Sequence, residues 1–190
     1  MGKIAITEFI SLDGVVEDPG GAEDYRHGGW SFKFDRGDAG NQFKLRETMD
    51  AQALLLGRTT YEGFAAAWPE REGEFADKFN SMPKYVVTST LTDPDWTNTT
   101  VIDGSGDVVA RVEELKRDLE GEIQVPGSVR LAQALLEADL VDELRLMVFP
   151  VLLGSGKRLF GAGDEMKTWS LKSVETVGDG VTIQIFEPVR

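Results

Sequence analysis

Cysteine is absent from the 190 residues of this chain, and histidine occurs once, at His27. The lack of cysteine excludes a thiol nucleophile, an iron–sulfur cluster, a cysteine-based zinc site and a disulfide framework. Because there is also only one histidine, we predict no metal site. Proteins without disulfides are typical of reducing compartments, so the predicted location is the cytoplasm.

Basic residues are also scarce. Lys and Arg number 20 against 33 Asp and Glu, which gives a formal net charge of -13, and no local block of basic residues stands out. A chain without excess positive charge has little with which to neutralise the phosphates of a duplex, so we predict no nucleic-acid partner. A small anion is not excluded, because backbone N–H groups at a helix start bind phosphate whatever the net charge.

Long apolar runs are missing too. No stretch reaches the ~18 apolar residues that a membrane span requires. The first residues, MGKIAITEFISLDG, lack the charged and then continuously apolar pattern of a signal peptide, so we predict no membrane association. With 41% hydrophobic and 28% charged residues, no internal repeat and no linker, the chain is predicted to form one domain spanning residues 1–190.

Strand-like and helix-like patterns alternate along the chain, which predicts an α/β fold with a mainly parallel central sheet covered on both faces. The last two strands differ, because Gly178-Asp179-Gly180 between them is a hairpin signal and predicts an antiparallel edge. The predicted strands are 3–12, 53–56, 84–88, 101–102, 122–125, 143–149, 171–177 and 181–186, and the predicted helices are 41–50, 60–68, one capped by Asp107 and one that carries Leu131, Leu135 and Leu136.

A first candidate phosphate-binding turn follows the apolar run at 53–56. Ligands of open α/β sheets bind beyond the carboxyl ends of the strands. In Gly57-Arg58-Thr59 the glycine allows close approach of the backbone, and the arginine offers a bidentate partner for an anion. The alternative is that Thr59 and Glu62 form a capping box while Arg58 is only solvated. The residues alone leave both interpretations open.

Two further turns have the same character. Thr88 and Ser89 offer hydroxyls that could bind phosphate or ribose, although hydroxyls are also common in ordinary turns. The helix predicted after Gly127 has no acidic residue in its first turn, so its positive end is open to an anion. The alternative there is a simple strand-to-helix turn with Ser128 as the helix N-cap.

Candidates for substrate chemistry lie in two loops. Asp13 follows the first strand and is the best-placed acid, with Glu17 close to it, although Asp13-Gly14 is also a turn signal. In the glycine-rich loop, Trp30 is the tryptophan that we expect to contact a ligand. The basic segment Gly154-Ser155-Gly156-Lys157 suits an anionic or sugar-phosphate substrate, with a solvated turn as the alternative. It is not a P-loop, because Arg158 stands where Ser or Thr must hold magnesium.

Five segments, in this order, resemble the dihydrofolate reductase-like superfamily, in the branch of the reductase domain of bacterial riboflavin biosynthesis proteins. They are SLDGVVEDP (11–19), LLLGRTTYEGF (54–64), KYVVTSTL (84–91), VPGSVRLAQALL (125–136) and VDELRLMVFPVLLGSGKRLF (141–160). The resemblance spans nearly the whole chain and implies a three-layer dihydrofolate reductase-like fold that binds NADPH. It implies that the cofactor phosphates meet Gly57, Arg58 and Thr59, that the adenosine 2′-phosphate lies near Thr88 and Ser89, and that the pyrophosphate rests on Gly127, Ser128, Val129, Arg130 and Leu131.

The same resemblance implies an NADPH-dependent reductase, similar to the domain that reduces 5-amino-6-(5-phosphoribosylamino)uracil. Such an enzyme passes a hydride to a heterocyclic or ribosylamino-pyrimidine substrate, with the proton supplied by Asp13 or by a bound water. The C-terminal strands and the family pattern indicate a homodimer with a shared edge. The substrate contacts that we expect are Glu17, Trp30, Gly154, Ser155, Gly156 and Lys157.

Two alternatives stay open. One is a dihydrofolate or pterin reductase. Folate reductases carry an acidic residue on the first helix, whereas the corresponding position here, near Asn41, has no carboxylate. The other is a non-catalytic nucleotide-binding module of the same fold, because the cofactor-side residues match the family better than any proton donor does.

Overall fold

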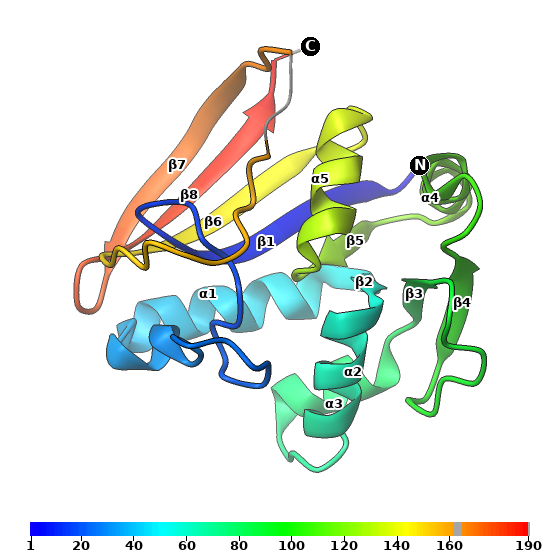
Figure 1. Cartoon of the computed structure of the whole chain (residues 1–190), viewed down its shortest axis with the longest axis horizontal. Helices are drawn as coiled ribbons and strands as arrows, with labels where there is room; N and C mark the ends of the chain where they lie inside the picture. Colours follow the sequence, from blue (N-terminus) through cyan, green and yellow to red (C-terminus); the bar gives the residue numbers. More distant parts are fainter. Residues whose placement is uncertain (162–164, 190) are drawn as a thin grey trace.

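The computed structural model describes residues 1–161 and 165–189, and within them the strands form one eight-stranded sheet (Figure 1). The strand order is β4-β3-β2-β5-β1-β6-β8-β7. Strands β1 to β6 run parallel, whereas β8 is antiparallel to both β6 and β7, so the predicted antiparallel C-terminal edge is confirmed. The strands are β1 Lys3–Ser11, β2 Ala51–Gly57, β3 Lys84–Thr88, β4 Thr99–Asp103, β5 Glu122–Val125, β6 Glu143–Phe149, β7 Trp169–Val177 and β8 Val181–Pro188.

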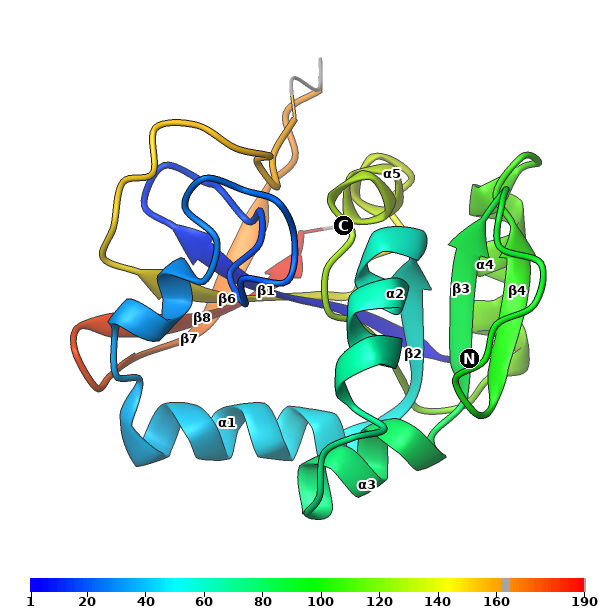
Figure 2. The same cartoon turned by 60° about the horizontal axis from the view of Figure 1, so that its bottom comes forward.

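Helices lie on both faces of the sheet, which gives the predicted three layers. In Figure 2, α1 lies on one side of β1 and α5 on the other. Leu55 packs in a core with residues of α4 and α5, whereas its neighbours Leu54 and Leu56 pack with residues of α2 and α3. The helices are α1 Gly37–Asp50, α2 Arg58–Ala67, α3 Glu74–Ser81, α4 Val108–Asp118 and α5 Val129–Glu137, with a 3₁₀ turn, η1, at Trp30–Lys33. None of these helices is long and apolar enough to cross a membrane.

Strand β1 shows how one segment serves both faces. Ile4, Ile6 and Ile10 belong to the core under α4 and α5, whereas Phe9 packs with the aromatic cluster on the opposite face. This alternation follows from the two-residue period of a strand. On the α1 side the Thr7 hydroxyl donates to the buried carboxylate of Glu47, 3.0 Å away, and this contact helps to fix α1 against the sheet.

Several element boundaries differ from the prediction. Helix α1 begins at Gly37, four residues before the predicted start, because two glycines among its first four residues hide the helical pattern. Helix α2 begins at Arg58, directly after the strand, and not at Thr60. Helix α3 was not predicted, and its eight residues bury mainly Ala76 and Phe79.

The carboxyl ends of the six parallel strands meet at one edge of the sheet. From β1 the chain moves to β2, β3 and β4 in one direction, and it then moves through β5 to β6 in the other. Ligands of open α/β sheets bind at the edge where the direction of the crossovers changes. The turns after β1, β2, β3, β5 and β6 therefore share the edge at which a ligand is expected.

Candidate functional site

The ends of β2 and β5 are joined by one serine side chain. The Ser128 hydroxyl accepts a hydrogen bond of 2.8 Å from the backbone N–H of Gly57 and donates one of 2.8 Å to the Thr60 hydroxyl. Two of the three predicted phosphate-binding turns, 71 residues apart in sequence, are therefore in direct contact. Thr60, the residue after the predicted contacts Gly57, Arg58 and Thr59, completes this junction.

Glycine is required on both sides of the junction. A Cβ atom on Gly57 would lie 2.5 Å from Ser128 Oγ, which is closer than real Cβ contacts, so any side chain there would displace Ser128. Gly127 has φ of +107°, a backbone conformation that L-residues rarely adopt. Ser128 itself has φ of +76°, so the turn is held in a strained conformation by its contacts.

Neither helix start at the junction is capped by a side chain. Helix α2 follows Gly57 and α5 follows Ser128, and both lack a side-chain cap hydrogen bond and an acidic residue in the first turn. Thr59 and Glu62 form no capping box, so that alternative is wrong. Ser128 is the N-cap residue of α5, as the other alternative has it, but its hydroxyl bonds across the junction instead of capping the helix. The first N–H groups of both helices keep the positive end of the helix dipole without a protein carboxylate.

The cations near the junction differ in their partners. Arg58 is exposed and forms an ion pair of 3.2 Å with Glu62, one turn along α2, so its guanidinium is held at the helix start. Arg130 is also exposed. Thr59 is exposed and Val129 half-buried, whereas the Leu131 side chain is 6% exposed and packs in the core, so Leu131 can offer only its backbone.

The third predicted turn lies at the end of the neighbouring strand β3. The Thr88 hydroxyl is buried and accepts hydrogen bonds from the backbone N–H groups of Thr90 and Leu91, so it shapes the turn. Ser89 is exposed. The turn packs against the end of β4, where Gly104 N–H donates to the Thr88 carbonyl over 2.9 Å. Ser89 is therefore the hydroxyl of this pair that is available to a ligand.

Asp13 occupies the end of β1 and is fully engaged with the loop after β6. Its carboxylate accepts hydrogen bonds from the Ser11 hydroxyl at 2.7 Å, from Leu153 N–H at 3.1 Å and from Gly154 N–H at 2.8 Å. These bonds, of which the one from Ser11 has the largest effect, lower the pKa of Asp13 to about 2. Such a carboxyl is ionised at neutral pH and holds no proton to deliver. Its contacts favour a positioning role over the predicted role as proton donor.

The remaining predicted substrate contacts join the loop after β1 to the loop after β6, and the pair of Glu17 and Lys157 is called the clasp. Lys157 donates its backbone N–H to Glu17 over 2.9 Å, and its Nζ forms an ion pair of 2.8 Å with the same carboxylate. The hydrogen bond with Lys157 lowers the pKa of Glu17. The Tyr25 hydroxyl donates to the Ser155 carbonyl, 2.6 Å away. The basic loop that includes Gly154 and Gly156 is thus held against the loop after β1, while Gly154, Ser155 and Lys157 stay exposed to solvent.

Trp30 corrects one prediction. Its side chain is 1% exposed and packs edge-to-face on Phe149, and its indole N–H donates to the Glu17 carbonyl over 2.8 Å. A ring that is covered on all sides cannot contact a substrate. Trp30 is therefore a core residue that supports the glycine-rich loop.

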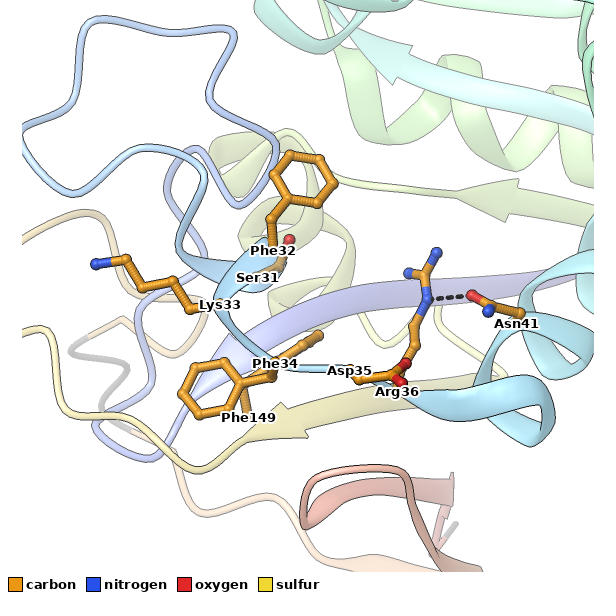
Figure 3. A pocket seen from close by; sticks show the side chains of 8 residues that line it. All are labelled: Ser31, Phe32, Lys33, Phe34, Asp35, Arg36, Asn41 and Phe149. Carbon is orange, nitrogen blue, oxygen red and sulfur yellow. Dashed lines mark hydrogen bonds between the residues drawn. The ribbon is translucent and has the colours of Figure 1, made fainter.

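A cavity of about 320 Å³ lies between η1, the start of α1 and the end of β6 (Figure 3). Of its lining residues, Asn41 stands at the position where folate reductases carry an acid. The other residues lie in a glycine-rich loop and a helix start with no recognisable spacing, so no pattern marked them. The lining consists of Ser31, Phe32, Lys33, Phe34, Asp35, Arg36, Asn41 and Phe149.

Comparison with known proteins identifies the family. The RibD C-terminal domain family matches residues 2–183. This chain belongs to that family. The resemblance seen in five sequence segments is therefore confirmed, and the match extends over nearly the whole chain.

Relatives of similar length and solved structures agree with this assignment. Two uncharacterized proteins of Bacillus subtilis, YwjB and YyaP, are each 27% identical to the chain. The match with YwjB covers 95% of this chain and 95% of YwjB. The match with YyaP covers 92% of this chain and 87% of YyaP. A Shewanella protein described as a riboflavin biosynthesis protein has the same fold, with a TM-score of 0.78 at 22% identity and 99% coverage of both chains. The RibD protein of Acinetobacter baumannii matches with a TM-score of 0.70 at 15% identity, and this chain spans 59% of its length. The RibD-like reductase fold is therefore shown.

Proposed function

We propose that the protein is an NADPH-dependent reductase that transfers a hydride to a heterocyclic or ribosylamino-pyrimidine acceptor. The observation that carries the proposal is the junction of Gly57, Thr60 and Ser128, which brings two uncapped helix starts to one edge of the sheet. Membership of the RibD C-terminal domain family adds support, because it implies a reductase.

The residues at this edge fit a dinucleotide. At Gly57 a Cβ would clash with Ser128, and at Gly127 the positive φ disfavours any residue with a Cβ. Both turns therefore keep a bare backbone, which a phosphate can approach closely. The N–H groups that begin α2 and α5 would hold the phosphates, and Arg58 and Ser89 would meet the 2′-phosphate. When bound, NADPH would supply the hydride. The chain supplies binding and orientation.

The chain also controls the proton. Asp13 is ionised at neutral pH and clamps the loop after β6, so in this proposal a water molecule delivers the proton and Asp13 positions the loop that encloses the acceptor. The clasp of Glu17 and Lys157 holds the same loop from its other end. Together they would keep bulk water out of the acceptor side, and this exclusion strengthens electrostatic contacts to the acceptor.

Dinucleotide binding tests the proposal. NADPH and NADH are titrated separately into the wild type and into Arg58→Ala, with nicotinamide fluorescence and melting temperature as readouts. We expect tighter binding of NADPH than of NADH, and a loss of about tenfold in NADPH affinity in Arg58→Ala with little change for NADH. Arg111→Ala, which removes an exposed arginine paired with Glu114 on α4, is the matched control for loss of one positive charge. If neither dinucleotide binds, the reductase proposal fails.

Turnover separates the reductase from its alternatives. NADPH oxidation is followed with a panel of pyrimidine and pterin acceptors. Dihydrofolate turnover would indicate the folate or pterin reductase, and persistent NADPH binding without transfer to any acceptor would indicate the non-catalytic module.

We also propose that the protein is a homodimer that shares the β7 edge. Strand β7 is the last strand at one edge of the sheet. Its Leu171 is 52% exposed and its Val174 is 58% exposed. An exposed edge strand with apolar side chains favours pairing with another strand. Light scattering at micromolar concentration is expected to give twice the 20.9 kDa chain mass, and Val174→Lys is expected to lower it. A monomeric wild type would contradict the proposal.

A further inference from the structure

The cavity beside α1 contains an arginine whose position is fixed by two contacts. Arg36 Nε donates to Asn41 Oδ1 over 2.6 Å, and the guanidinium carbon lies 5.2 Å from the centre of the Phe9 ring. Figure 3 shows the terminal nitrogens extending beyond the Asn41 bond, on the side of the ribbon where Phe32 lies. The guanidinium is therefore oriented before any ligand arrives, which reduces the entropy lost on binding.

The terminal nitrogens of Arg36 have no hydrogen-bond or ion-pair partner among residues 1–161 and 165–189. Burial lowers the pKa of Arg36, while the charges of Asp35 and Glu47 raise it. A guanidinium nevertheless stays charged in proteins, and its planar fork matches a carboxylate or phosphate in a bidentate manner. Lys33 adds a second positive charge to the lining, against one acid, Asp35, whose carboxylate already accepts from Gly37 N–H.

Aromatic rings form the rest of the cavity wall. Phe149 is held in place by edge-to-face contacts with Phe9, Trp30 and Phe34, at ring-centre distances of 5.3 to 6.0 Å. Phe32, by contrast, is 78% exposed at the cavity, although a phenyl ring of this size is usually covered. Phe149 is only 1% exposed and supports the wall from behind, so the exposed ring of Phe32 is the one against which a flat ligand can stack.

The cavity also lies where an acceptor would be needed. Phe149 is the last residue of β6 and pairs in register with Ser11, the last residue of β1. The junction of Gly57 and Ser128 lies at the ends of β2 and β5, and β5 is the other neighbour of β1. The two sites therefore share the carboxyl edge of the sheet, on adjacent strands.

We propose that this cavity, the Arg36 pocket, binds a flat heteroaromatic acceptor that carries an acidic group, and that Arg36 determines this specificity by pairing with that group. The inference rests on the proposed reductase function and deepens it by naming the class of acceptor. Asn41 is a positioning residue in this scheme, since it acts through Nε of Arg36.

Binding of acceptor analogues without any dinucleotide tests the proposal, so failure of the NADPH site cannot disguise the result. Isothermal titration calorimetry is carried out with two acidic probes, orotate and pterin-6-carboxylate, with their uncharged counterparts uracil and pterin, and with inorganic phosphate. We expect at least one acid to bind about tenfold or more tightly than its uncharged counterpart and than phosphate.

Variants then assign the effect to Arg36. Arg36→Gln is expected to abolish the preference for the acidic probe, and Arg36→Lys to retain only part of it, because lysine keeps the charge without the fork. Asn41→Ala is expected to weaken binding severalfold. Arg46→Gln removes an exposed arginine of α1, the helix that follows Arg36, and is the matched control, with unchanged binding. Melting temperatures of all variants establish that each is folded.

Three results would overturn the inference. They are an absence of binding by both acidic probes at millimolar concentration, equal binding of the acidic and uncharged rings, and unchanged acid preference in folded Arg36→Gln. Phosphate binding as tight as that of the acids would reduce the pocket to an anion site and would overturn the assignment of an aromatic acceptor. NADPH binding, measured in the same variants, is expected to stay unchanged.

Discussion

The two halves of the carboxyl edge are built in different ways. Around β2 and β5 the site consists largely of backbone: glycine turns, free N–H groups at two helix starts and one serine bridge. Around β1 and β6 it consists of side chains, with Asp13, Glu17 and Lys157 locking two loops and Arg36 set in an aromatic cavity. Backbone recognition suits the phosphates common to all dinucleotides, whereas side chains set the choice of acceptor. The halves should therefore respond to different mutations.

The largest expected effect is at the backbone half. Gly57→Ala places a methyl group 2.5 Å from Ser128 Oγ, so the junction must open. We expect NADPH affinity to fall by about tenfold or more, equivalent to about 1.4 kcal/mol. In Gly57→Ala/Ser128→Gly the clash is removed, and part of the affinity should return in fluorescence titrations. An equally weak double variant would show that the steric account is wrong.

At the clamp of the side-chain half the expected effect on NADPH binding is smaller, and the loss concerns the stability of the loop. Asp13→Ala removes the acceptor of the Leu153 and Gly154 amides, which costs about 2 kcal/mol for charge-assisted bonds. We expect faster hydrogen exchange at these two amides and a lower turnover number, with NADPH affinity unchanged. Asp13→Asn keeps an acceptor oxygen, so its amide exchange and turnover should lie between those of the wild type and those of Asp13→Ala. If Asp13→Asn instead kept protected amides but lost all turnover, Asp13 would be the proton donor after all.

Glu8, on β1, provides a control that concerns stability alone. It is 6% exposed, its Oε1 has no hydrogen-bond partner among the described residues, and burial raises its pKa to about 8 against an ordinary value near 4.5. The folded state binds this proton more tightly than the unfolded chain. The stability that the protonated group contributes is therefore fully present below about pH 4.5 and is lost as the pH rises through about 8.

Glu8→Gln lacks this titration. We expect its unfolding free energy, relative to the wild type, to increase from about pH 5 to about pH 8, by at most about 1.4 kcal/mol per pH unit. Urea denaturation at several pH values measures the difference. NADPH and orotate binding should be the same in both proteins. A difference in stability that does not depend on pH would mean that Glu8 titrates normally.

Much of the fold and half of the candidate site could be predicted from the sequence for physical reasons. Strand β5 has the predicted bounds, and the hairpin of β7 and β8 follows from Gly178-Asp179-Gly180, because buried strands and tight turns are local patterns. The turns at Gly57 and Gly127 could be found because glycine directly after a strand is itself a signal. Their direct contact through Ser128 was not visible in either segment.

The side-chain half was harder to predict because its residues come from irregular loops. Trp30 occurs in a glycine-rich loop that looks exposed, yet the loop folds back and buries the ring on Phe149. Arg36 precedes a helix whose first residues include two glycines, so neither the helix start nor the cavity could be located. Asp13 was found by position, but part of the lowering of its pKa comes from bonds to Leu153 and Gly154, 140 and 141 positions away.

The most direct test of the account is a crossed binding measurement on two variants. NADPH and the acidic probe that binds best are each titrated into Gly57→Ala and Arg36→Gln. The account predicts that Gly57→Ala loses NADPH affinity and keeps the acidic probe, whereas Arg36→Gln keeps NADPH and loses the probe. If each variant weakened both ligands equally while remaining folded, the edge would not consist of two separate sites, and the central claim would be contradicted.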